Sequence, residues 1–199
     1  MSQLPEDTGF QVWIDIGCTI EYLHTKEILH LDIKDKNILL GKDGRAKLCD
    51  FELSIQHTVK PVAHNGGTPK YIPPEFILSG DRGRLDDVWG FGIVMMFVLG
   101  ILPRVSEGGW MIADVRVKAE TAVKMAEWLD KVEQGKRRIP DKYSLLVKIL
   151  DANPRRRSTF SELVKDLRAL PQVTLSPRNS LHDNGGKAYY GVTIMVFML

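Results

Sequence analysis

The stretch HLDIKDKN, residues 30–37, is the most informative part of this sequence, because it brings polar side chains of several chemical kinds into one short segment. Asp32 and Lys34 are two residues apart, so in an extended loop their side chains can converge on one reacting site. Asn37 closes the stretch, and Asp50, the first residue of the segment DFE at residues 50–52, adds a further carboxylate. A carboxylate and an amide oxygen are hard ligands, which suit Mg²⁺ held together with substrate phosphates better than zinc or copper.

Two short apolar runs connect these polar segments. Residues 38–40 and 46–49 flank the sequence GKDG at residues 41–44, whose Asp-Gly pair is a strong turn signal. The pattern predicts a small β-hairpin. If this hairpin folds back on itself, it brings Asn37 and Asp50 together.

Helical periodicity predicts a mainly α-helical chain around this hairpin. Apolar residues recur at three- and four-residue spacing in residues 10–26, which predicts an amphipathic helix, and residues 87–99 are apolar nearly throughout, which predicts a buried central helix. Residues 50–74 have no sustained period and predict a long loop of the kind that is functional or disordered. Three further helices with polar faces are predicted at residues 119–132, 142–150 and 159–169, the last begun by a capping box between Ser158 or Thr159 and Glu162.

Composition narrows the class of protein. With 44% hydrophobic and 26% charged residues the chain of 199 residues has the material for a core, and 27 basic against 25 acidic residues give no reason to expect a nucleic-acid partner. The two cysteines cannot build a disulfide framework and lack the neighbours of a metal site.

Membrane insertion and secretion are not expected. The apolar run at residues 88–103 contains three glycines and is shorter than the roughly 20 residues that a spanning helix needs. The first nine residues carry two carboxylates where a secretory signal needs a basic region and an apolar run. We therefore expect an intracellular protein, cytoplasmic or nuclear, whose residues 171–199 form an irregular tail.

The polar stretch and the segment DFE together resemble the catalytic loop and metal-binding motif of eukaryotic protein kinases, H-R-D-x-K-x-x-N and D-F-G. Residues 67–75, GTPKYIPPE, are similar to the end of that family's activation segment. Residues 87–92, DVWGFG, are similar to the start of its central helix, and residues 153–159, NPRRRST, to its late arginine motif. The motifs occur in the family's order. The resemblance implies a mainly α fold with a small β-hairpin, the C-terminal lobe of an α+β kinase fold, over residues 1–170, with a catalytic loop at 30–37 and an activation segment at 50–75.

The resemblance also implies a reaction, the transfer of the γ-phosphoryl group of ATP to serine or threonine hydroxyls of a protein. Asp32 would accept or orient the proton of the attacking hydroxyl, and Lys34 would steady the transferring phosphoryl group. Asn37 and Asp50 would hold Mg²⁺ on the nucleotide phosphates, and Leu39 would lie beneath the adenine ring. ATP and Mg²⁺ are the expected cofactors, and a protein is the expected substrate or partner.

Six further positions are implied to support the site. Glu75 would pair with Arg157 and lock the activation segment to the lobe, and Asp87 would accept hydrogen bonds from the backbone of the catalytic loop. The other three side chains are His30 and Phe51, stacked below the site, and Thr68, hydrogen-bonded near Asp32 and Lys34.

The sequence departs from the family pattern at three points. Leu31 stands where the family has an arginine that pairs with a phosphorylated activation loop, and Glu52 replaces the glycine of D-F-G. Nothing before residue 10 resembles the family's N-terminal lobe, with its Gly-rich loop and strand lysine, so the sequence is short by about one lobe. A truncated or partial kinase domain is therefore expected.

Two alternatives remain open from the sequence. The chain could be an inactive, pseudokinase-like binding or scaffold module, or a small-molecule phosphotransferase, since such enzymes share a loop of the form H-x-D-x-x-x-x-N. Lys34 and the segment at residues 67–75 argue against the small-molecule enzyme.

Overall fold

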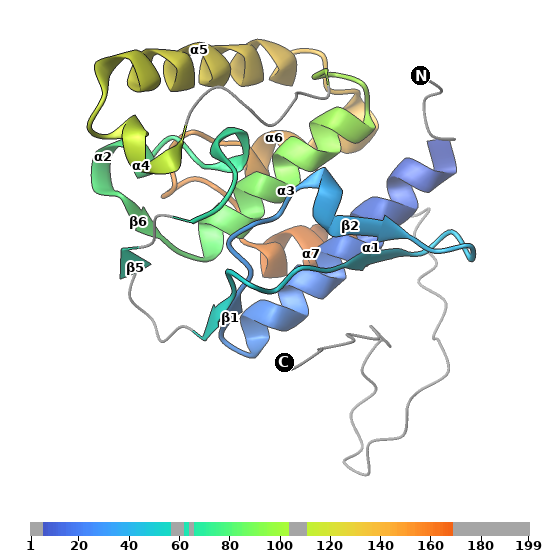
Figure 1. The fold of residues 1–199 in the computed structure, drawn as a ribbon. Helices are drawn as coiled ribbons and strands as arrows, with labels where there is room; N and C mark the ends of the chain where they lie inside the picture. Colours follow the sequence, from blue (N-terminus) through green and yellow to red (C-terminus); the bar gives the residue numbers. More distant parts are fainter. Residues whose placement is uncertain (1–5, 57–61, 64–65, 104–110, 169–199) are drawn as a thin grey trace.

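The computed structural model describes residues 6–56, 62–63, 66–103 and 111–168 (Figure 1). The predicted tail at residues 171–199 lies outside the described residues. Within the described ranges the chain forms seven α-helices: α1 (Glu6–Thr25), α2 (Phe76–Ser79), α3 (Arg84–Val98), α4 (Ile112–Val115), α5 (Ala119–Lys136), α6 (Leu145–Ile149) and α7 (Phe160–Arg168).

Short antiparallel strand pairs and single 3-10 turns connect these helices. The hairpin predicted from the Asp-Gly turn is present, and it pairs Ile38 with Leu48 and Leu40 with Ala46. The strand pairs are β1 (Ile28–Leu29) with β4 (Ile55–Gln56), β2 (Ile38–Leu40) with β3 (Ala46–Leu48), and β5 (Val62–Ala63) with β6 (Asp81–Arg82); the turns are η1 (Asp35–Asn37), η2 (Pro69–Tyr71) and η3 (Asp141–Tyr143).

Helix α3 is the centre of the molecule, with α1 and α6 packed against it, α7 packed against α1, and α5 above it (Figure 1). Its residues from Asp86 to Phe97 are all buried. A β-carbon on Gly92 would lie 2.6 Å from Leu150, so the absence of a side chain there lets the segment that follows α6 approach α3 closely. The prediction of a buried central helix is confirmed.

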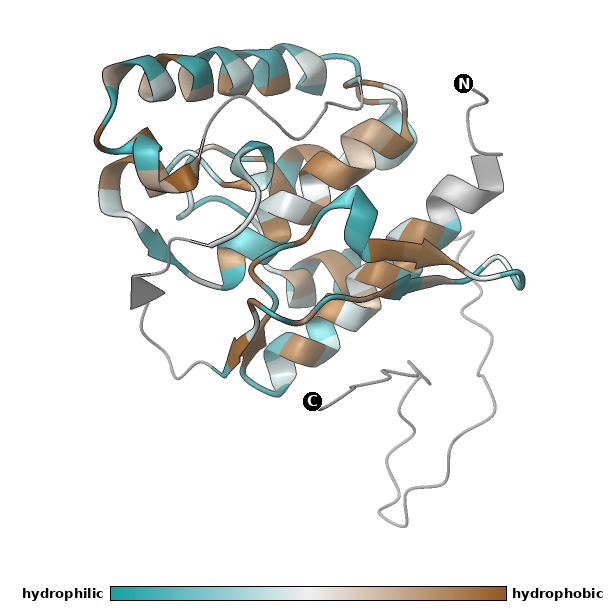
Figure 2. Cartoon of the chain, in the orientation of Figure 1, coloured by the Kyte–Doolittle hydropathy of each residue, from teal (hydrophilic) through white to brown (hydrophobic). Residues whose placement is uncertain are grey.

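Helix α1 contributes one apolar face to the same core. Trp13, Ile16, Ile20 and Leu23 are all buried, as the predicted amphipathic pattern requires. Figure 2 shows the hydrophobic residues of α1 and α3, whereas α5 carries many hydrophilic residues along its length. Each of the buried side chains of α1 contributes about 1.5–3 kcal/mol to the free energy of folding when it is fully buried.

A buried carboxylate attaches the hairpin to α1. Asp15 accepts hydrogen bonds from the backbone N–H of Ala46 at 3.0 Å and from the side chain of Gln11 at 2.9 Å. It also forms an ion pair with Arg45. Burial raises the pKa of Asp15, and the bonds from Ala46 and Arg45 oppose that rise. The position of β3 along α1 is thereby set, and with it the position of the residues at either end of the hairpin.

Two predictions of secondary structure were wrong in detail. Residues 50–74 are not loop throughout, because β4 and β5 pair with distant strands and η2 forms one turn. Residues 142–150 form η3 and the short α6 rather than one helix. The helix at residues 159–169 begins at Phe160, and its capping box uses Thr159, whose backbone N–H donates to Glu162 at 2.7 Å.

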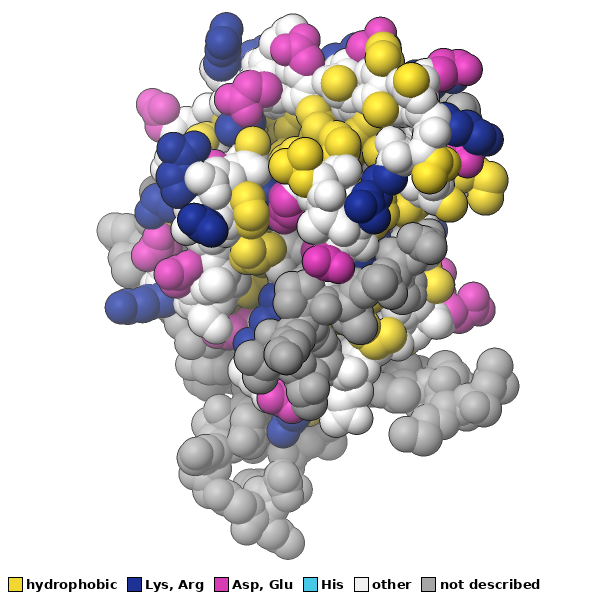
Figure 3. Space-filling view, turned by 90° about the vertical axis from the view of Figure 1, so that its left-hand side faces the viewer, with side chains coloured by type: hydrophobic (Ala, Val, Ile, Leu, Met, Phe, Trp, Pro, Cys, Tyr) yellow, Lys and Arg dark blue, Asp and Glu magenta, His cyan; other side chains and the backbone are white. Residues whose placement is uncertain are grey.

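The end of the molecule formed by α2, α4 and the start of α5 exposes hydrophobic side chains, bordered by charged ones (Figure 3). The most exposed large hydrophobic side chains here are Leu78, Val117, Met111 and Val123. Exposed apolar surface of this kind is often used in contacts with other molecules. None of the helices in the described ranges is long and apolar enough to cross a membrane.

Candidate active site

Asp87, at the start of α3, anchors the loop that follows β1. Its two carboxylate oxygens accept hydrogen bonds from the backbone N–H of His30 at 2.9 Å and of Leu31 at 2.8 Å, and His24 Nε2 lies 2.9 Å from Oδ2. Burial alone would raise the pKa of Asp87, but the hydrogen bond and charge of His24 and the backbone hydrogen bond from His30 lower it below its ordinary value. The ionised carboxylate therefore ties the loop to the central helix. Leu31 adopts a positive φ of 63° at this point, and the chain turns toward the next polar residues.

Four polar side chains converge just beyond this turn. The Nζ of Lys34 lies 2.7 Å from Asp32 Oδ2, and the hydroxyl of Thr68 donates to Asp32 Oδ1 at 2.9 Å. The Nδ2 of Asn37 donates to the Asp32 backbone carbonyl at 2.9 Å and to its Oδ2 at 3.2 Å. Lys34 also donates to Thr68 Oγ1 at 3.3 Å, which joins the loop to the segment at residues 67–75. Only 7% of Asp32 is exposed, and contacts to both carboxylate oxygens set its orientation.

Extended backbone at Lys34 helps its side chain to meet Asp32. Lys34 has φ −151° and ψ 164°, so side chains two residues apart lie on the same side of the chain. The 3-10 turn η1 then reverses the chain and brings Asn37 back against Asp32.

His30 is a packing residue beneath this cluster. Burial lowers its pKa, so the imidazole is neutral near pH 7. Its Nδ1 accepts from the backbone N–H of Asp32 at 3.3 Å, which leaves Nε2 to donate to the carbonyl of Cys49 at 3.1 Å. The ring of Phe51 meets the imidazole edge to face, with centroids 4.9 Å apart. With both nitrogens occupied, His30 has none left with which to act as a base.

The hairpin returns the chain to the cluster. The backbone N–H of Cys49 donates to the carbonyl of Asn37 at 2.9 Å, so Asp50 follows directly beside Asn37. Asp50 is exposed and has a positive φ of 65°. Leu39, on β2 between them in sequence, is 55% exposed.

Asn37 and Asp50 both carry oxygen atoms of the kind that Mg²⁺ prefers as ligands. Because Asn37 uses its amide nitrogen to bind Asp32, the amide oxygen is the atom that a cation can use, and the exposed carboxylate of Asp50 supplies a second oxygen. No group of three or more histidines, cysteines, aspartates and glutamates in the described ranges could hold a metal without help. These two oxygen ligands fit a Mg²⁺ ion that takes its remaining ligands from water and phosphate.

An ion pair between a buried arginine and a partly buried glutamate holds the far end of the segment at residues 67–75. Arg157 donates to both oxygens of Glu75, at 2.6 and 2.8 Å, and its side chain is fully buried. It also donates to the carbonyls of Asp151 at 2.9 Å and Leu85 at 3.2 Å, and its guanidinium lies 4.9 Å from the centre of the Trp89 ring.

Sequence reasoning missed Arg82, which connects three segments of the site. Its Nη2 donates to the carbonyl of Leu31 at 3.0 Å, its Nη1 donates to that of Gly66 at 2.7 Å, and its Nε pairs with Asp86. Burial raises the pKa of Asp86 to about 6, although the charge of Arg82 opposes this. An arginine four residues before an aspartate is common on exposed helices, so only the burial of the pair distinguishes it.

Comparison with known proteins places this geometry in context. Residues 1–167 match a family model described as protein kinase domain. The chain is 43% identical over 96 residues to the human cAMP-dependent protein kinase catalytic subunit PRKX, which is 48% of this chain and 26% of that protein. It is 29% identical to Aurora kinase of Schizosaccharomyces pombe over 80% of this chain and 42% of that protein. It is also 29% identical to the rice CBL-interacting protein kinase 20, over 82% of this chain and 35% of that protein. The chain thus spans less than half the length of these curated relatives.

Proposed function

Because the chain belongs to the protein kinase domain family, we propose that it is the catalytic C-terminal lobe of a serine/threonine kinase that transfers the γ-phosphoryl group of ATP to protein hydroxyls. The observation that supports this proposal best is the cluster around Asp32, in which Lys34, Thr68 and Asn37 hold a nearly buried carboxylate in one orientation. Catalysis of phosphoryl transfer depends mostly on positioning and on charge stabilisation, and this cluster supplies both.

Asp32 and Lys34 have separate parts in the proposed reaction. Asp32 Oδ1 accepts one hydrogen bond from Thr68, and a carboxylate oxygen can accept two, so it can also accept the hydroxyl of a substrate and take its proton. Lys34 places a positive charge 2.7 Å from the other carboxylate oxygen, where it would also neutralise charge on the phosphoryl group.

Mg²⁺ and ATP belong to the proposal as well. When bound, ATP supplies the phosphoryl group and Mg²⁺ neutralises the charge on its phosphates. Asn37 would contribute its amide oxygen to the metal and Asp50 its carboxylate. Leu39 would offer its exposed side chain to the adenine ring.

The test is transfer of labelled phosphate from Mg²⁺-ATP to a generic acceptor protein, with the chain alone and, if one exists, with the longer protein that contains it. We expect Asp32→Asn to lower the rate by about a hundredfold or more, since proton transfer by a positioned side chain is worth that much. Asp43→Asn, in the exposed hairpin turn, is the matched control and should leave the rate unchanged. Transfer that Asp32→Asn does not reduce, or no transfer by either protein, would sink the proposal.

A second candidate function is a catalytically inactive module that binds a protein as a scaffold. Glu52 favours it, because this exposed carboxylate lies two residues from Asp50, where it would compete for or repel ligands of the metal site. Thermal denaturation with and without Mg²⁺-ATP separates the two candidates. A rise in Tm that Asp50→Asn abolishes would count against the inactive module.

A further inference from the structure

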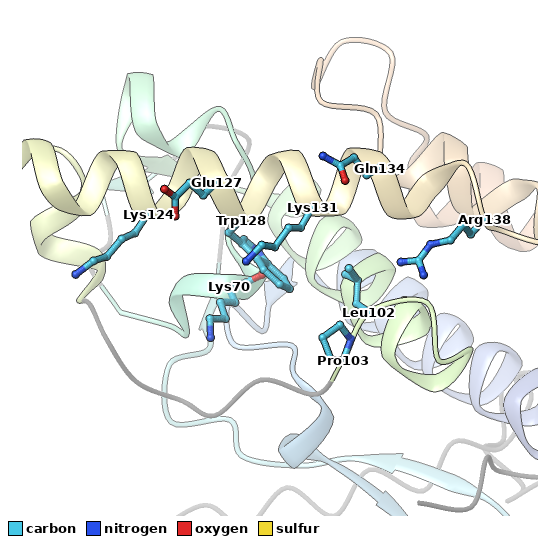
Figure 4. Close-up of a pocket in the computed structure, with 9 residues that line it drawn as sticks. All are labelled: Lys70, Leu102, Pro103, Lys124, Glu127, Trp128, Lys131, Gln134 and Arg138. Atoms are coloured by element: carbon cyan, nitrogen blue, oxygen red, sulfur yellow. The ribbon is translucent and has the colours of Figure 1, made fainter.

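A groove of about 460 Å³ lies against helix α5 (Figure 4). One wall is helix α5, and the others come from η2 and from the residues that follow α3. The proposed reaction uses none of its lining residues, which are Lys70, Leu102, Pro103, Lys124, Glu127, Trp128, Lys131, Gln134 and Arg138.

The inner surface of the groove is apolar and held in place. Trp128 is buried, and its indole N–H donates to the carbonyl of Lys70 at 2.8 Å. The same ring stacks on Phe97 of α3, with centroids 6.3 Å apart and an angle of 28° between the planes. Leu102 is also buried on this side. A bound side chain would therefore meet a preformed apolar surface.

The rim of the groove is strongly basic. Four of its lining residues are lysine or arginine and only Glu127 is acidic, although the chain as a whole is nearly balanced in charge. Lys124 pairs with Glu120 at 2.5 Å, and Arg138 donates to the carbonyl of Ile101 at 2.5 Å.

Lys70, on η2, and Lys131, on α5, both line the groove. Burial and the charge of Lys131 both lower the pKa of Lys70, which means that the two ammonium groups are close enough to repel. An anionic group between them would relieve that repulsion and would be attracted by the excess of positive charge around it.

One lining residue of the groove, Lys70, is close in sequence to the Asp32 cluster. Lys70 follows Thr68 by two residues, and Thr68 donates to Asp32. Two residues of extended chain span about 7 Å at most, so one bound segment is long enough to occupy the groove and approach the cluster.

We propose that this groove binds an acidic segment of a protein partner, with an apolar side chain against Trp128 and Leu102 and carboxylates beside Lys70 and Lys131. The apolar inner surface and the mainly basic rim match a peptide in which acidic and hydrophobic residues are mixed. Binding of this segment requires no chemistry at Asp32 and is independent of phosphoryl transfer.

The test uses the full chain and fluorescently labelled peptides, with binding followed by fluorescence anisotropy. The probe peptide carries glutamates around one leucine; a second peptide replaces every glutamate by glutamine, a third by lysine, and a single-stranded oligonucleotide is the fourth probe. We expect the acidic peptide to bind most tightly and to weaken as salt is added.

Matched variants locate the binding. Lys131→Glu should weaken the acidic peptide by about tenfold, the equivalent of one lost and one repulsive charge contact. Lys42→Glu makes the same change of net charge in the exposed hairpin turn and should leave binding unchanged. Equal weakening by both variants, equal binding of the acidic and glutamine peptides, or preference for the oligonucleotide would overturn the proposal.

The same assay separates this proposal from the proposed function. Asp32→Asn should bind the acidic peptide as tightly as the original chain. If transfer activity is lost and peptide binding is retained, the groove proposal is unaffected. If transfer activity is present and the peptide does not bind, only the groove proposal is contradicted.

Discussion

The ion pair between Glu75 and Arg157 offers the sharpest test of how this fold is held together. The substitution Glu75→Gln removes one charge with little change in shape and leaves the guanidinium, which is fully buried, without its counter-charge. Breaking a buried pair in this way costs about 3–5 kcal/mol. Arg157 keeps two backbone carbonyls, at 2.9 and 3.2 Å, and the face of the Trp89 ring. We therefore expect the lower end of that range, a loss of about 3 kcal/mol in the free energy of unfolding.

An exposed ion pair in the same chain provides a control. Lys148 and Asp166 form an ion pair of 3.0 Å whose side chains are 57% and 43% exposed. Solvent screens that pair, so Asp166→Asn should cost less than about 1 kcal/mol. The two pairs differ in burial and in the number of hydrogen bonds, because Arg157 contacts both oxygens of Glu75 and Lys148 contacts one oxygen of Asp166.

Urea unfolding followed by tryptophan fluorescence measures both losses. The variants Glu75→Gln, Arg157→Met and their combination complete a double-mutant cycle, in which we expect a coupling energy of about 2 kcal/mol. If the two single losses add to within about 0.5 kcal/mol, or if Glu75→Gln costs no more than Asp166→Asn, the pair does not lock the segment as argued.

Two further substitutions test the connections around Arg82. Burial raises the pKa of Asp86 to about 6 from an ordinary 3.8, so the unfolded chain loses this proton first and the free energy of unfolding falls as the pH rises between these values. Asp86→Asn removes that fall, and urea unfolding of both proteins from about pH 4 to pH 7 should show their stability difference changing by up to about 3 kcal/mol; a constant difference would contradict the raised pKa. Gly67→Ala would place a β-carbon 3.0 Å from the carbonyl of Leu31 at a φ of 110°, whereas Gly44→Ala meets open space at a φ of 72°. We expect a loss of about 1 kcal/mol at Gly44 and at least twice that at Gly67, measured by thermal denaturation, and equal losses would mean that no close approach exists.

Local sequence patterns were sufficient to predict the elements that depend on residues close together in the chain. The Asp-Gly turn between two apolar runs predicted the hairpin, and the apolar stretch from residue 87 predicted the buried helix α3. Both succeed because turn chemistry and periodic burial act between neighbours in the sequence. The sequence also named the polar residues that the structure brings together around Asp32, since a motif of fixed spacing needs no knowledge of distant contacts.

What depends on distant contacts was visible only in the tertiary structure. Strands β1, β4, β5 and β6 have two residues each, too few for a periodic signal, and they form because the folded chain brings their partners alongside. The attachment of the hairpin to α1 through Asp15, and the joining of three segments by Arg82, likewise require side chains to be buried opposite specific backbone groups. The groove beside Trp128 is the same kind of feature. By itself the sequence determined which chemical groups are present and the helices and hairpin that carry most of them, because those depend on neighbouring residues; the tertiary structure decided which charges are paired, buried or left facing a groove, because that depends on residues far apart in the chain meeting in space.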